Sequence, residues 1–163
     1  MSTRGLMGVR VNGVEKLSYN HSDSYPEGLG IEVVYDVKRM VGDLASWRRL
    51  AEDLILISGD DKPSSDDIAK FMSFGDFSVG TRSPDDWYCL LRAFQGNIHD
   101  TLKMGRMIDS REFFLDSLFC EWAYIIDFDV ETFQVYRGGN TLVLEFPLST
   151  IPVEWIDLIK GYK

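Results

Sequence analysis

The sequence predicts an α+β domain in which one mostly antiparallel sheet of about five strands is covered by helices from the middle of the chain. Strand-like patterns occur near the two ends of the sequence, and amphipathic helical patterns lie between them. Strands and helices do not alternate as they would in a parallel βαβ fold. The 163 residues are 45% hydrophobic, which suits a single domain spanning residues 1–163.

The first two strands are predicted to form a hairpin within residues 6–19. Asn12 and Gly13 separate two short apolar runs, and both residue types tolerate the positive φ angles of a type I′ turn. A two-residue loop then pairs Arg10 with Glu15. Apolar residues fall on both faces of this pair, so we expect other elements to cover the hairpin on both sides.

The middle of the chain predicts several helices. Residues 31–41 carry apolar side chains at four-residue steps, and a second apolar stripe over residues 44–57 follows Asp43, a suitable N-cap. Shorter helical patterns lie around residues 68–72, 84–94, 109–117 and 149–163. In the last of these we expect Trp155, Leu158 and Ile159 to face the core.

The last third of the chain predicts an antiparallel meander of residues 118–127, 132–136 and 141–146. Alternating side chains from Leu118 to Ile126 indicate one buried face, and the sequence RGGN is typical of a hairpin turn. The terminal strands are expected to join one sheet.

Charge and composition narrow the classes of partner. The formal net charge of -9 disfavours binding to nucleic-acid phosphates and to anionic membranes. No apolar run approaches the roughly 18 residues of a membrane-spanning helix, and no signal peptide is recognisable. Cys89 and Cys120 lie within apolar patterns, which predicts buried, reduced thiols. These features together predict a cytoplasmic protein.

Residues 19–30, YNHSDSYPEGLG, form the most distinctive stretch of the sequence. We expect Asp23 to form an Asx turn, and Gly28 to allow positive φ just before a helix. The simplest interpretation is a turn that begins the helix. The alternative is a ligand-binding site at the rim of the hairpin.

The ligand-binding interpretation assigns a role to five residues. His21, Asp23 and Tyr25 would project from the rim, and Gly28 would lie beside free amide groups at the helix N-terminus, which attract anions. Arg4 would reach the same place from the neighbouring strand. Such a site suits a small molecule that carries a phosphate or carboxylate and a flat ring.

Metal binding and acid–base catalysis have weaker support in the sequence. His21 and His99 each have one neighbouring carboxylate, whereas a stable metal site needs three or four ligands, so we predict no metal and no cofactor. Asp127 and Asp129 are able to share a proton, but such a pair is more typical of a hydrated strand end.

Three stretches together resemble a known family: STRGLMGVRVNG, YNHSDSYPEGLG and FCEWAYIIDFDVETFQVYRGG. The family comprises uncharacterised proteins from bacteriophages, bacteria and fungi. Its members have an N-terminal Thr-Arg-Gly or Thr-Arg-His strand, an Asp-x-Tyr-Pro-x-Gly turn and a Trp-Ala-Tyr hairpin. The likeness covers both ends of the chain and is closest to phage-type members. It implies a counter-defence role in the host cytoplasm, in which a nucleotide-type signal is sequestered or degraded.

A second likeness is to N-terminal-nucleophile hydrolases. Ser2 would become the first residue if Met1 were removed, and its own α-amine would act as the base for its hydroxyl. Arg4 would stabilise the oxyanion. The usual Cys or Thr is missing at this position. Three functions therefore stay open: small-molecule binding, amide hydrolysis by Ser2, and interaction of the acidic surface with a basic host protein.

Overall fold

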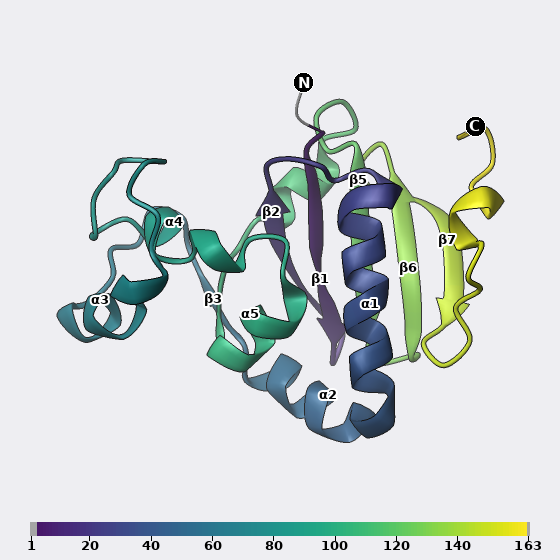
Figure 1. Cartoon of the computed structure of the whole chain (residues 1–163), viewed down its shortest axis with the longest axis horizontal. Helices are drawn as coiled ribbons and strands as arrows, with labels where there is room; N and C mark the ends of the chain where they lie inside the picture. The colour runs from purple at the N-terminus through teal and green to yellow at the C-terminus, as the bar shows by residue number, and fades with distance from the viewer. Residues whose placement is uncertain (1–2, 163) are drawn as a thin grey trace.

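The computed structural model describes residues 3–162 and has the predicted α+β architecture (Figure 1). Five strands form one sheet in the order β2-β1-β5-β6-β7, in which β1 and β5 are parallel and the other neighbours antiparallel. These strands are β1 (Gly5–Val11), β2 (Val14–Asn20), β5 (Trp122–Asp127), β6 (Thr132–Arg137) and β7 (Thr141–Pro147). The N-terminal hairpin and the C-terminal meander thus join in one sheet, as predicted.

The helices come from the middle of the chain. They are α1 (Ile31–Met40), α2 (Leu44–Asp53), α3 (Ser65–Phe71), α4 (Trp87–Leu90) and α5 (Ile98–Met104). A second, two-stranded parallel sheet pairs β3 (Ile55–Ile57) with β4 (Arg106–Ile108). In Figure 1, α1 lies along one face of the large sheet with α2 and α5 beside it, while α3 and α4 lie at the end of the molecule furthest from β7.

The helix expected over residues 44–57 is shorter than predicted. It ends at Asp53, because Leu54 adopts an extended backbone and the next three residues pair with β4. Ile57, the last apolar residue of the predicted stripe, therefore belongs to a short strand. A short apolar run does not by itself distinguish a final helical turn from a buried strand.

The expected helix over residues 149–163 is also wrong in extent. Only Trp155–Leu158 form a helical turn, of the 3-10 type, and the chain becomes extended at Ile159. Trp155 and Ile159 are buried as predicted, but Leu158 is 50% exposed.

The strand expected over residues 118–127 begins only at Trp122. The preceding residues form a turn in which the Asp116 carboxylate accepts hydrogen bonds from two backbone N–H groups, at 3.0 and 2.8 Å. Leu118 is consequently exposed, and Cys120 packs on the opposite face of the sheet from Trp122.

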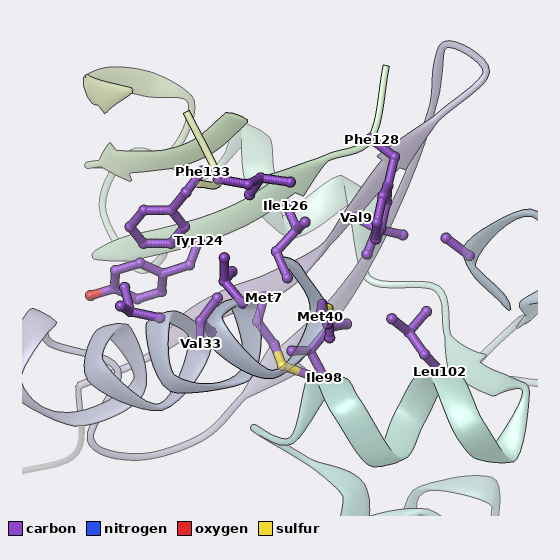
Figure 2. Packing of buried hydrophobic residues seen from close by; sticks show 14 of the residues in the cluster. Met7, Val9, Val33, Met40, Ile98, Leu102, Tyr124, Ile126, Phe128 and Phe133 are labelled. Atoms are coloured by element: carbon purple, nitrogen blue, oxygen red, sulfur yellow. The ribbon is translucent and has the colours of Figure 1, made fainter. Parts of the chain in front are cut away.

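The hairpin has the predicted register, with Arg10 opposite Glu15, and both of its faces are covered. On one face, side chains of β1, β5 and β6 pack against α1 and α5 (Figure 2). This cluster includes Met7, Val9, Val33, Met40, Ile98, Leu102, Tyr124, Ile126 and Phe133. The other face carries a smaller cluster of Leu6, Leu17, Phe114, Cys120, Ala123, Ile125 and Tyr136.

Lys16 fixes the hairpin to α2. Its ammonium group donates hydrogen bonds to the carbonyls of Ala51, Glu52 and Leu54, at 2.7, 3.0 and 2.8 Å. A cation at the C-terminus of a helix satisfies carbonyls that lack intrahelical partners and is favoured by the helix dipole. Burial lowers the pKa of Lys16, an effect opposed by the nearby charges of Asp53 and Glu52. The connection orients α2 against the sheet.

Gly8 lies where β1 and β2 approach too closely for any side chain. A Cβ at this position would overlap the Lys16 carbonyl oxygen. We expect Gly8→Ala to lower the free energy of unfolding by about 3 kcal/mol, because the rigid backbone of β2 would have to move. Gly42→Ala is a matched control with no atom within 4 Å of the added methyl, and its effect should stay within about 1 kcal/mol. Urea denaturation measures both values, and equal effects would contradict the steric argument.

Both cysteines are free and buried, as the sequence predicted. Burial raises the pKa of the Cys120 thiol to about 12, and the charge of Asp116 adds to this. Because the thiolate is the reactive species, we expect Cys120 to resist a disulfide reagent such as DTNB at pH 8 in the native protein and to react after unfolding. A Cys89→Ser variant assigns the reaction to Cys120, and rapid modification of that variant when native would refute the prediction.

Candidate functional site

A cavity of about 80 Å³ lies where the edge strand β2 meets β4 and the α4–α5 region. Its apolar walls are Leu91, Phe94, Met107 and Ile108. Its polar lining residues are Ser18, Tyr19, Tyr88, Gln95, Thr101, Arg106 and Ser110. One water molecule needs roughly 10–15 Å³ of such volume, so the cavity has room for several waters or one small ring.

Tyr19, the first residue of the distinctive stretch, lines this cavity and is held from several sides. Its hydroxyl lies 2.8 Å from Nδ1 of His21, and its ring packs edge-on against Phe113 at 5.3 Å between centroids. The backbone N–H of His21 donates to Gln95 Oε1 at 2.8 Å. Burial raises the pKa of Tyr19, while the positive charge of Arg4 lowers it. The end of β2 is thereby joined to the helical region beside the cavity.

Arg4 is held just before β1 by contacts of its side chain and its backbone. Its guanidinium lies over the ring of Phe119, 5.7 Å from the ring centroid. Its backbone carbonyl accepts from the N–H of Glu121 at 3.0 Å, which fixes the start of β1. Of the predicted site residues, His21 contacts a tyrosine that the sequence analysis did not include in the site, and neither His21 nor Arg4 lines the cavity itself.

Asp23 and Gly28 lie elsewhere, in a second hollow of about 270 Å³. Asp23, Glu27 and Glu32 all line this hollow, and no Lys, Arg or His of residues 3–162 does so. Gly28 is required here for a reason other than the one expected. Its φ angle is not positive, but a Cβ would overlap the Asp23 carbonyl oxygen. Three carboxylates repel an anion, so this hollow does not suit the predicted phosphate or carboxylate.

The amide groups expected to be free at the start of α1 already have acceptors. A single π-helical turn, Pro26–Gly30, precedes the helix. Within it, the N–H of Gly28 donates to the Tyr25 carbonyl at 2.9 Å and that of Leu29 to the Asp23 carbonyl at 2.8 Å. The carbonyl of Asp23, rather than its side chain, therefore closes the turn. The anion cradle expected at this position does not form.

Tyr25 is 36% exposed, and it makes a minor contribution to the raised pKa of Tyr162. The Tyr162 hydroxyl donates to Glu27 at 2.8 Å. Burial, followed by this hydrogen bond, raises the pKa of Tyr162 to about 12. Tyr25 does not line the cavity around Tyr19. Ser2, the predicted nucleophile, lies outside the described residues.

Asp127 and Asp129 have separate partners and do not form a proton-sharing pair. Asp127 is buried and accepts from Arg10 Nη1 at 2.9 Å. Asp129 accepts from the backbone N–H groups of Asn12 and Gly13, at 2.7 and 2.8 Å. Those two hydrogen bonds lower the pKa of Asp129. Both carboxylates therefore hold strand ends together, which was the simpler interpretation of the sequence.

The sequence analysis missed the cavity residues contributed by the α4–α5 region and β4. Arg106 and Met107 belong to β4, a strand of three residues that was not predicted. The available signal was Gly105, which ends α5 in the left-handed conformation with φ at 78° and directs the chain into the strand. No pattern in the sequence placed that strand beside β2.

Across residues 3–162, no group of three or more His, Cys, Asp or Glu side chains is arranged to hold a metal ion. None of the helices in the same range has the length and apolar character needed to cross a bilayer. Comparison of the chain with protein-family models, with curated proteins and with solved structures finds no match.

Proposed function

We propose that the protein binds a small molecule with a flat ring in the cavity lined by Tyr19. The observation that carries the proposal is the cavity itself, with apolar walls and a few polar groups where the sheet meets the helical region. Ligand sites in proteins are usually concave and mostly apolar, with a small number of polar groups that fix the orientation of the ligand.

The lining residues give the ligand both burial and orientation. Leu91, Phe94 and Met107 are almost completely buried, so a ring against them would exchange water for apolar contacts. Phe94 also supplies an aromatic ring for offset or edge contact. Tyr19 and Tyr88, which also line the cavity, combine a ring with a polar hydroxyl group. This combination of apolar and polar lining residues suits a ring that carries one polar substituent.

The proposal extends to the nucleotide-type signal that a phage counter-defence protein would sequester. With about 80 Å³ available, a nucleotide would enter through its base, and the sugar and phosphate would lie outside the cavity. Arg4 and His21, beside Tyr19, are the residues that would then face the phosphate. Degradation of the signal would require a further catalytic group, and the proposal here is binding.

A thermal-shift screen against single-ring aromatic compounds, nucleobases and nucleoside monophosphates tests the proposal. A ligand at 100 times its Kd should stabilise the protein by about 2.7 kcal/mol. We expect Ser18→Phe, which places a ring in the cavity, to abolish the shift caused by each hit. Strand residues tolerate Phe well, so the variant should fold.

Ser22→Phe is the matched control, because Ser22 lines the second hollow and not the cavity. This variant should keep the shift of each hit. Loss of binding in Ser22→Phe with retention in Ser18→Phe would place the site in the acidic hollow and overturn the proposal. The absence of any stabilising compound at millimolar concentration would overturn it as well.

A further inference from the structure

Arg106 is the only charged residue that lines the cavity, within the part of the chain from residue 3 to residue 162. The sequence contains 26 Asp and Glu residues, yet none of those described lines this space. The cavity therefore differs in charge from the rest of an acidic protein. A local positive potential of this kind attracts anionic ligands.

The guanidinium of Arg106 has hydrogen-bonding capacity to spare. Its Nη1 donates to the Gly105 carbonyl at 3.1 Å. No carboxylate of the described residues lies within 4.0 Å of it, since the ion pairs of the structure involve other side chains. Its charge reaches Asp67, whose pKa it helps to lower, but that carboxylate lies outside the cavity. A half-buried arginine beside apolar walls gains most from a counter-charge on a ligand.

We propose that the cavity binds a monocyclic aromatic carboxylate, with the carboxylate on Arg106 and the ring against Leu91, Phe94 and Met107. This inference rests on the proposed function and narrows its ligand class. A planar guanidinium offers parallel donors that match the two oxygens of a carboxylate. The apolar lining next to it strengthens the attraction, because little water is left to screen the charges.

The neutral polar groups of the cavity are consistent with one anionic group. Gln95 accepts the His21 N–H through its side-chain oxygen, which leaves its NH₂ group as a donor. The hydroxyl of Tyr88 is a further donor on the same lining. Arg4 does not line the cavity, but its positive charge lowers the pKa of Tyr19, which does. All these groups donate to or attract an anion.

Isothermal titration of the full-length protein with benzoate and with benzamide tests the inference. The two probes have the same ring and nearly the same size, and they differ in charge. We expect benzoate to bind at least tenfold more tightly than benzamide. Arg106→Gln should remove this preference and weaken benzoate binding at least tenfold, while benzamide binding stays within about twofold.

Two further variants test whether the effect depends on the guanidinium of Arg106 in particular. Arg106→Lys keeps the positive charge but loses the planar guanidinium with its two parallel donors. The affinity for benzoate should therefore lie between those of the wild type and Arg106→Gln. Arg111→Gln removes an exposed arginine paired with Asp109, outside the cavity, and should leave both affinities unchanged. Circular dichroism verifies that each variant is folded.

The outcomes separate this inference from the proposed function. If benzoate and benzamide bind equally well, and Ser18→Phe abolishes both, the cavity binds rings but the charge assignment is wrong. If neither probe binds while neutral rings from the screen do, the carboxylate class is again excluded and small-molecule binding survives. Benzoate binding that is insensitive to Arg106→Gln would also overturn the inference.

Discussion

The five-stranded sheet depends on the guanidinium of Arg10, which joins four adjacent strands. From its position on β1 it contacts Glu15 of β2 at 2.6 Å, Asp127 of β5 at 2.9 Å and Gln134 of β6 at 2.7 Å. Gln134 continues the series by donating to Glu145 of β7 at 2.9 Å. Charge-assisted hydrogen bonds of this kind are stronger than neutral ones and fix the register of the strands that they connect. The pair of Arg10 and Asp127 spans 117 residues of sequence, so it also holds the two ends of the chain together.

The position of the candidate site follows from this arrangement. Because β1 lies between β2 and β5, β2 becomes an edge strand, and the middle of the chain must pass beside it to reach β5. The chain does so at β4, and just beyond it the N–H of Ser110 donates to the Leu17 carbonyl at 2.9 Å. The cavity lies at this junction. It is formed by side chains that the sheet and the helical region each leave incompletely packed, which is where ligand sites commonly occur.

The sequence predicted the sheet well and the site only in part. Asn12 and Gly13 have the turn chemistry of a tight hairpin, so the register of β1 and β2 followed directly. The three-residue strand β4 has no periodicity to detect, so Arg106 could not be placed. His21 and Arg4 were predicted from residue type and register; neither lines the cavity, although His21 contacts Tyr19, which does. The prediction of free amide groups before α1 was wrong. The backbone N–H groups of the π-helical turn donate to carbonyls of the same loop, and no sequence pattern indicated this turn.

A single turn separates the cavity from the acidic hollow. Gln95 lines the cavity, and the next residue, Gly96, lines the hollow against the side chain of Asn20. Gly96 has a φ angle of 79°, which glycine adopts without strain, and a side chain there would strike the Asn20 amide. Arg106 lines one space and three carboxylates line the other, so two neighbouring recesses carry opposite charge. An anion would therefore meet attraction at the cavity lined by Arg106 and repulsion at the hollow lined by the three carboxylates.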